Sequence, residues 1–169
     1  GCSRGRRPQR SAPHRRPGVA LLAVVTLFSG NLLGYDPLEL THAPGPSEDR
    51  TFFDATRDRE IPVRITLPQG MGPYPVLLFS HGLGGSREGN RYLSEQWAGR
   101  GYAVVFLQHP GSDAGVWKGQ PLADRMAALE AAANPTNFLA RAQDVSFVLD
   151  ELQRRAGDPG DGLFEKLNL

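Results

Sequence analysis

The sequence predicts an α/β fold with a mainly parallel sheet, and three observations support this class. Residues 76–79 and 103–107 are short, continuously apolar segments, as in strands buried on both faces of a parallel sheet. A glycine-rich turn and a candidate helix over residues 90–100 separate them, which is the order of a βαβ unit. A strand with alternating apolar residues precedes this unit, and 169 residues are enough for one domain with a core.

Two strands are expected before the βαβ unit, over residues 51–55 and 61–67. The second alternates apolar and more polar positions, the period-2 pattern of a strand with one buried face. Residues 56–60 are polar and form the expected hairpin connection. The apolar positions of the second strand are Ile61, Val63, Ile65 and Leu67.

The helix over residues 90–100 is expected to end at Gly101, because glycine readily adopts the left-handed conformation that closes many helices. Its expected buried residues are Tyr92, Leu93, Gln96 and Trp97.

Two further helices are expected, one at about residues 122–133, ended by Pro135, and one over about residues 138–152, with Thr136 or Asn137 as its cap. In the second, apolar residues recur every three or four positions and therefore share one face. Residues 161–169 show no clear element, and the further parallel strand expected next is absent. The expected apolar face consists of Phe138, Ala142, Val145, Leu149 and Leu152.

The first 35 residues predict a targeting or anchoring segment. An arginine-rich start precedes an apolar run over residues 19–28 and the small residues Ser29 and Gly30, the layout of a secretory signal. The run is shorter than the roughly 20 apolar residues of a spanning helix, but residues 19–34 together would serve for membrane association. An export signal, an uncleaved anchor and a soluble extension all remain open. The expected location is periplasmic or extracellular, with anchoring as an option.

Charge and cysteine content argue against nucleic-acid binding, an internal disulfide and a multi-cysteine zinc site. Removing the six arginines that precede Pro17 changes the formal net charge from +1 to −5, so the body is mildly acidic and nucleic acid is not an expected partner. Cys2 is the only cysteine, which excludes an internal disulfide and a multi-cysteine zinc site. The histidine spacing also indicates no metal site, and no cofactor is expected.

The glycine turn at residues 80–86 is the segment with the clearest chemistry. It follows the buried strand directly, and its glycines allow a sharp turn with close approach of a ligand to the main chain. A backbone N–H held there can stabilise an oxyanion. The alternative is an ordinary strand-to-helix turn, since such turns favour glycine. A dinucleotide fingerprint fails because Arg87 stands where its last glycine belongs, and no P-loop motif occurs.

Several segments in order resemble one branch of the α/β-hydrolases, the platelet-activating-factor acetylhydrolase and dienelactone-hydrolase-like proteins. The similar segments are residues 59–64, 79–86, 92–94, 98–105, 108–113 and 141–150. The resemblance covers roughly residues 51–152 and is specific for family rather than for substrate. It divides the chain into the N-terminal segment 1–35, a proline-rich linker 36–50, and the N-terminal part of an α/β-hydrolase domain, 51–169.

The resemblance implies roles for the glycine turn. The backbone N–H of Leu83 would be one oxyanion donor, and His81, Gly82 and Gly84 would shape the loop or contact substrate. Arg141 and Asp144 would be structural positions of the last helix.

The family's nucleophile, acid and base are expected to be absent from this chain. Gly-x-Ser-x-Gly occurs only around Ser3, in the arginine-rich start with no strand before it, so this match is attributed to chance. In this fold the triad runs Ser, Asp or Glu, then His along the chain. His81 and His109 precede the place of the serine, so both are interpreted as structural, with His109 hydrogen-bonded at a strand end. Asp113 is interpreted as a turn residue.

Two functions follow as expectations. The first is a serine esterase or lipase-like hydrolase that acts through an acyl-enzyme on a small-molecule or lipid ester; this chain would supply the oxyanion loop and be inactive alone. The alternative is a non-catalytic hydrolase-like binding module or an inactive truncated product. If the sheet lacks a strand beside residues 76–79, that edge is also expected to promote association.

Overall fold

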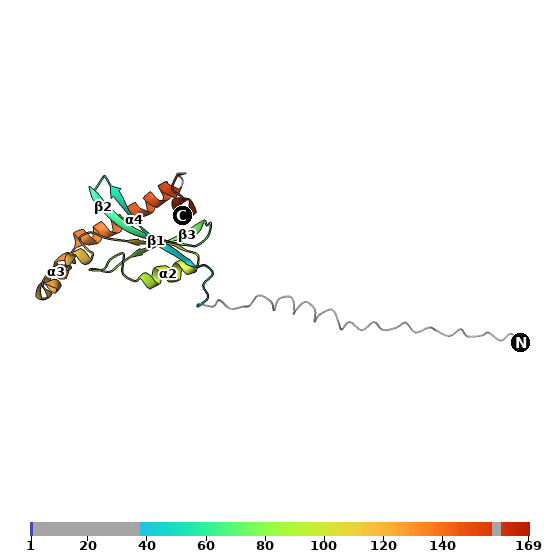
Figure 1. Cartoon of the computed structure of the whole chain (residues 1–169), viewed down its shortest axis with the longest axis horizontal. Helices are drawn as coiled ribbons and strands as arrows, with labels where there is room; N and C mark the ends of the chain where they lie inside the picture. The colour runs from blue at the N-terminus through green and yellow to red at the C-terminus, as the bar shows by residue number, and fades with distance from the viewer. Residues whose placement is uncertain (2–37, 157–159) are drawn as a thin grey trace. The chain divides into compact units, whose positions relative to one another are not determined.

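The computed structural model describes residues 1, 38–156 and 160–169, and residues 38–169 form one compact unit. The predicted segments at residues 1–35, including Cys2 and the serine motif around Ser3, therefore lie outside the described residues, apart from Gly1. In the described part, no helix combines the length and apolar character needed to cross a membrane. The elements are β1 (Pro44–Asp54), β2 (Arg59–Pro68), β3 (Tyr74–Ser80), α2 (Arg91–Gly99), β4 (Ala103–Leu107), η1 (Ala114–Val116), η2 (Leu122–Asp124), α3 (Arg125–Ala132), α4 (Pro135–Ala156), η3 (Phe164–Lys166) and β5 (Leu167–Asn168) (Figure 1).

The strands form one sheet in the order β1-β2-β4-β3-β5. β1 pairs antiparallel with β2, and β2 antiparallel with β4. β3 pairs parallel with both β4 and β5. The predicted α/β class and the βαβ unit, here β3-α2-β4, are therefore confirmed, and parallel pairing is confined to β4, β3 and β5.

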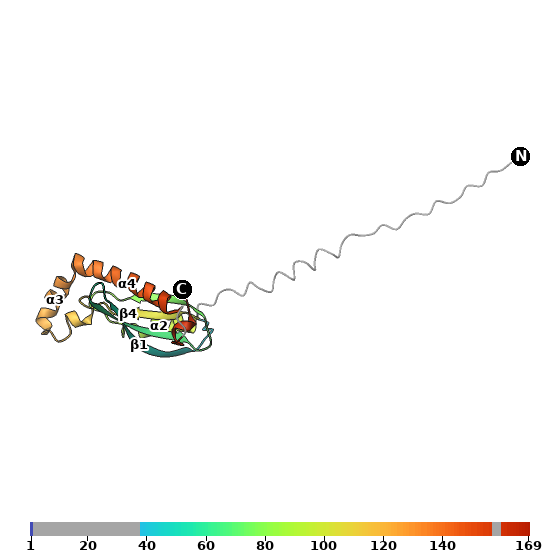
Figure 2. The ribbon, with the colours of Figure 1, turned by 90° about the horizontal axis from the view of Figure 1, so that it is seen from above.

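Helices cover both faces of the sheet, because alternate residues of β4 pack against different helices. Val104 and Phe106 pack with Ala98 of α2 in one buried cluster. The alternate residues of β4 belong to a larger cluster with Val148 and Leu152 of α4. α4 runs along one side of the sheet, and α3 lies beyond the end of the strands (Figure 2). A five-residue strand buried at every position is what a continuously apolar segment predicts.

β1 is longer than expected, because it begins at Pro44 and not near residue 51. Residues 44–50, expected as linker, pair with β2 down to the Pro44–Pro68 match. Their side chains are mostly exposed, so an edge strand of this kind leaves little apolar periodicity in the sequence. The hairpin over residues 56–60 is confirmed, and Asp54 accepts hydrogen bonds from the amides of Thr56 and Arg57.

The end of α2 matches the expectation, but its buried face does not. Gly101 has φ +88, and its N–H and that of Tyr102 bond to the carbonyls of Ala98 and Trp97, which is a Schellman closure. Tyr92 is 62% exposed, although it was expected to be buried. The fully buried positions are the small residues Ser94, Ala98 and Gly99, because the helix lies close to the sheet.

α4 begins earlier and presents a different face from the expected one. The side chain of Asn134 accepts from the Asn137 N–H, so Asn134 is the cap and Pro135 the first helical residue. Phe138 is 72% exposed and Leu149 is 42% exposed. The buried residues are Asp144, Val148 and Leu152. The pattern of apolar residues could not identify this face, because the buried carboxylate of Asp144 lies on it.

The C-terminal segment contains elements that the sequence pattern did not indicate. Phe164 and Leu167 are buried in the larger core cluster, and β5 pairs with Tyr74 and Pro75 at the start of β3. The expectation that no further parallel strand follows was therefore wrong, since β5 is a two-residue parallel strand. Its shortness explains why no periodicity was visible.

Candidate functional site

The glycine turn follows β3 and lies against the loop that follows β4. Both strands are parallel neighbours, so their carboxyl ends lie at the same edge of the sheet. The Gly84 N–H donates to the Ser112 carbonyl at 2.9 Å, and the Ala114 N–H donates to the Gly85 carbonyl at 2.7 Å. Backbone hydrogen bonds thus join residues 79–86 to residues 108–113, two of the segments that resemble the family.

The second loop is braced by its own side chains. Gln108 accepts from the Arg87 N–H at 2.8 Å and donates to Asp113. Asp113 also accepts from the Gly115 N–H and begins a short 3₁₀ helix. The interpretation of Asp113 as a turn residue agrees with this geometry.

Gly84 is required by both conformation and packing. Its φ is +75, a left-handed value that favours glycine, and an added Cβ would lie 2.8 Å from Leu129 Cδ2. The indole N–H of Trp117 donates to its carbonyl at 2.7 Å. An added Cβ at Gly82, in contrast, would meet no atom within 4 Å. A side chain at position 84 would therefore be strained, whereas the space around Gly82 would accept one.

His81 has one tautomer fixed by its neighbours. The His109 backbone N–H donates to Nε2 of His81 at 3.3 Å, so Nε2 is an acceptor. Nδ1 then has the proton and donates it to the Gly82 carbonyl at 2.7 Å. Burial lowers the pKa of His81, the bond to Gly82 opposes the shift, and the nearby charge of Arg141 lowers the pKa further. His81 is consequently neutral at pH 7.

This histidine also orients the Leu83 amide. The Gly82 carbonyl accepts from both His81 Nδ1 and the Gly85 N–H, the latter at 3.0 Å. The Leu83 N–H belongs to the same planar peptide group and points away from that carbonyl. Within residues 38–156 and 160–169 no acceptor bonds the Leu83 N–H. The turn therefore holds one unbonded, oriented donor, on a residue that is 44% exposed.

A hydrogen-bond chain runs from the exposed Ser80 to the buried His109 and Asp144 behind the turn. Ser80 Oγ is 2.8 Å from His109 Nε2, and His109 Nδ1 is 3.0 Å from Asp144 Oδ2. Asp144 also accepts from Arg57 at 2.9 Å and from Arg59 at 2.8 and 2.9 Å. Burial raises the pKa of Asp144, but the hydrogen bonds from His109, Arg59 and Arg57 outweigh burial and lower it to about 2. The carboxylate is therefore ionised.

The hydrogen bonds connect Ser80 to His109 and His109 to Asp144, as in a catalytic triad. The charges around Asp144 oppose such a role. A general base must accept a proton and become an imidazolium that the carboxylate stabilises. Here two guanidinium groups already offset the charge of Asp144, so a positive His109 would be poorly stabilised. The arrangement favours a structural role for His109, which is held between Ser80 and Asp144.

Arg141 lies on α4, where the resemblance implied a structural helix position, and its side chain contacts both loops. Its Nη2 donates to Ser80 Oγ at 3.0 Å and to the His81 carbonyl, and its Nη1 donates to Ser112 Oγ at 3.4 Å. Burial lowers its pKa, and Asp144 opposes the shift. Asp144 thus binds groups of the hairpin and of His109, whereas Arg141 reaches across to the two loops.

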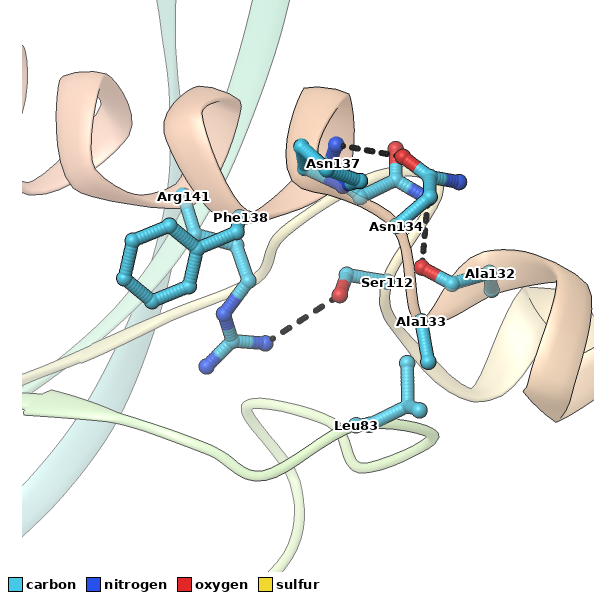
Figure 3. A pocket seen from close by; sticks show the side chains of 9 residues that line it. Leu83, Ser112, Ala132, Ala133, Asn134, Asn137, Phe138 and Arg141 are labelled. Atoms are coloured by element: carbon cyan, nitrogen blue, oxygen red, sulfur yellow. Dashed lines mark hydrogen bonds between the residues drawn. The ribbon is translucent and has the colours of Figure 1, made fainter.

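A cavity of about 550 Å³ adjoins this edge of the sheet. Leu83 and Arg141 face the same opening, with Phe138 beside it (Figure 3). The exposure of Phe138, unexpected for a helix core position, is explained by this placement. The lining residues are Leu83, Ser112, Ala132, Ala133, Asn134, Pro135, Asn137, Phe138 and Arg141.

Of the sequence-predicted loop residues, Leu83 lines this opening, whereas His81, Gly82 and Gly84 belong to the same turn but are not among the lining residues. Sequence reasoning did not find the role of Arg141 or the chain that starts at Ser80. Their partners lie far apart in sequence, so spacing gives no signal for them. In the part of the chain described, no group of three or more metal-ligating side chains could hold an ion.

The sheet order, the helices on both faces and the oriented turn after β3 define an α/β-hydrolase fold. The family model for platelet-activating factor acetylhydrolase, isoform II, matches residues 59–153, more than half of the chain. This chain belongs to that family.

A solved structure shows a weaker likeness. The PEG-bound complex of a cold-adapted esterase from an Arctic intertidal metagenomic library aligns with 66% of this chain at 21% identity and a TM-score of 0.42. This chain covers 47% of that esterase, about half its length. No curated protein matches the sequence.

Proposed function

We propose that this chain supplies the oxyanion loop of a serine carboxylic-ester hydrolase, with the Leu83 backbone N–H as one oxyanion donor. The observation that supports the proposal is the unbonded Leu83 amide beside the 550 Å³ cavity. A fixed donor of this kind stabilises the tetrahedral intermediate without reorganising when charge develops. In α/β-hydrolases one donor comes from the loop after the third strand.

The reaction would use a serine that attacks the ester carbonyl and forms an acyl-enzyme, which water then hydrolyses. We place the nucleophile, acid and base outside these 169 residues. β5 runs parallel to β3, so a strand-to-helix elbow after β5 would emerge at the same edge as the glycine turn. Substrates would be small-molecule or lipid esters, since the lining near Leu83 is mostly apolar.

The proposal also covers location and domains. Residues 1–35 would direct export to the periplasm or the outside, with residues 19–34 available for membrane association. Residues 36–43 would link this segment to the sheet, which begins at β1. Fusing residues 1–43 to a reporter that is active only after export tests this part, and a reporter that stays inactive contradicts it.

The central experiment is labelling with a fluorophosphonate, which reacts with activated serines. We expect a longer product of the same reading frame, continuing past Leu169, to be labelled at a serine of a Gly-x-Ser-x-Gly motif. The chain ending at Leu169 should not be labelled. Labelling at Ser80, or no labelling of the longer product, would overturn the proposal.

A second arm removes only the donor. The Gly85 N–H bonds to the Gly82 carbonyl, and Gly84 has positive φ, so Leu83 is the second residue of a type II turn, where proline is common. Leu83→Pro deletes the N–H and fits the turn. In the longer product we expect kcat to fall about 10²–10³-fold, while Leu83→Ala, which keeps the amide, stays near wild type.

A further inference from the structure

The cavity beside Leu83 combines apolar walls with a single charged group. Leu83, Phe138 and three alanine or proline side chains contribute its hydrocarbon surface. Arg141 is the one charged residue among those that line it. Ser112, Asn134 and Asn137 are its neutral polar residues, and Asn137 already donates to the Gly111 and Ala132 carbonyls.

Arg141 has no carboxylate within ion-pair distance in residues 38–156 and 160–169. Its partners are the Ser80 hydroxyl, the Ser112 hydroxyl and the His81 carbonyl, all neutral. Asp144 acts on it only at longer range, and that carboxylate already binds Arg57, Arg59 and His109. A partly buried cation with only neutral partners is a favourable place for an anion.

The guanidinium also has donors to spare. It carries five N–H groups, and three hydrogen bonds use three of them, which leaves two. The buried side-chain polar atom without a partner in the described residues is Nη2 of Arg57. Nε of Arg141, which makes no hydrogen bond within the described residues, is therefore not a buried atom. Leu83, whose backbone N–H makes no hydrogen bond in the described residues, lines the same space (Figure 3).

We infer that this cavity binds a monocarboxylate with a short hydrocarbon tail, its carboxylate on Arg141 and its tail against Phe138 and Leu83. A planar cation that keeps an unused N–H donor and has no carboxylate partner can bind one carboxylate. The apolar lining favours a hydrocarbon body, and 550 Å³ lies within the roughly 300–1,000 Å³ typical of small-molecule sites. The identity of this acid as the acyl product of ester hydrolysis rests on the proposed function, whereas the binding does not.

The site would consequently give product inhibition in the complete enzyme. An acid released by deacylation would stay beside the Leu83 amide until it dissociates, and Arg141 would hold it there. Neutral esters of the same chain length would lack the charge-assisted hydrogen bond. The device thus distinguishes the product acid from the substrate ester by charge alone.

The test measures binding to the full chain at low micromolar concentration by tryptophan fluorescence. Trp117 reports on the turn through its bond to the Gly84 carbonyl, and Trp97→Phe leaves it as the only indole. We expect sodium hexanoate to bind at least tenfold more tightly than hexanamide, its neutral counterpart. Sodium acetate, which lacks the tail, and inorganic phosphate should each bind at least tenfold more weakly than hexanoate.

Variants place the carboxylate. Arg141→Gln should weaken hexanoate binding at least tenfold and leave hexanamide binding unchanged, while Arg154→Gln on the exposed end of α4 should leave both unchanged. If Arg141→Gln does not fold by circular dichroism, the wild-type comparison of hexanoate with hexanamide decides alone. Equal affinity for those two ligands overturns the inference, and so does phosphate binding as tightly as hexanoate. Neither outcome affects the fluorophosphonate result, so the two proposals fail separately.

Discussion

His109 and Asp144 are both fully buried and are joined by a hydrogen bond of 3.0 Å between Nδ1 and Oδ2. The bond links the end of β4 to the middle of α4. Arg57 and Arg59, from the β1-β2 hairpin, bind the same carboxylate. Asp144 therefore ties together three segments that hold the site's edge of the sheet.

Asp144→Asn is expected to lower the free energy of unfolding by about 3–5 kcal/mol, because the fully buried carboxylate is lost. Among the described residues, the partly buried Arg59 then keeps no carboxylate partner, while Arg57 keeps only Asp54. The measurement is equilibrium unfolding in urea. Asp150→Asn, at an exposed position of the same helix, is the matched control and should change stability by less than about 0.5 kcal/mol. Similar losses of stability in the two variants would show that the buried carboxylate of Asp144 does not stabilise the fold in this way.

Acid should remove the contribution of Asp144. Its pKa is lowered from 3.8 to about 2, so as pH falls the unfolded state binds a proton first. The stabilisation is complete above about pH 4 and is lost between 3.8 and about 2. Glu151 also has a lowered pKa of about 2, but it is present in both proteins. The stability difference between wild type and Asp144→Asn should therefore shrink across this interval, and a constant difference would contradict the assignment.

Residue patterns predicted the parallel half of the sheet well. Residues 103–107 are apolar at every position because α2 and α4 cover both faces, and the sequence displays this burial directly. β1 shows little such pattern, since most of its residues from 44 to 51 are exposed. The faces of α2 and α4 were misjudged for related reasons. Small residues line the first, and a buried carboxylate lies in the second.

The site was predictable as a loop but not as an electrostatic arrangement. The glycines at 82, 84 and 85 indicate close approach to the main chain, and the resemblance then implies the Leu83 amide. Arg141 lies about 60 residues further along the chain, at a separation of 60 from His81 and 61 from Ser80. No spacing rule relates such distant positions, because tertiary packing of α4 brings them together. The resemblance implied only a structural helix position for Arg141.

The two glycines of the turn provide a paired prediction. Gly84→Ala should destabilise the protein by at least about 1–2 kcal/mol from the left-handed conformation alone, with added strain against Leu129. Gly82→Ala meets open space and should leave folding near wild type. Thermal unfolding of both variants measures this. Equal destabilisation would mean that the turn has a different conformation.

The protonation state of His81 is open to direct observation by NMR. We expect the ring to titrate below its ordinary pKa of 6.5 and to have its proton on Nδ1 at pH 7, because burial disfavours the charged form. The unfolded chain protonates first as pH falls, so stability decreases below about pH 6.5 towards the lowered pKa. His81→Gln should remove that decrease. A ring with its proton on Nε2 at pH 7 would contradict the assigned bond to Gly82.

The outer edge of β3 is only partly covered, and this predicts self-association of the chain. β5 pairs with Tyr74 and Pro75, whereas no strand among the described residues pairs with residues 76–80 on that side. An unpaired apolar edge offers N–H and C=O groups to another chain. We expect apparent mass in size-exclusion chromatography with light scattering to rise with concentration. A wild-type chain that stays monomeric and unfolds cooperatively across the whole concentration range would show that β5 protects the edge sufficiently.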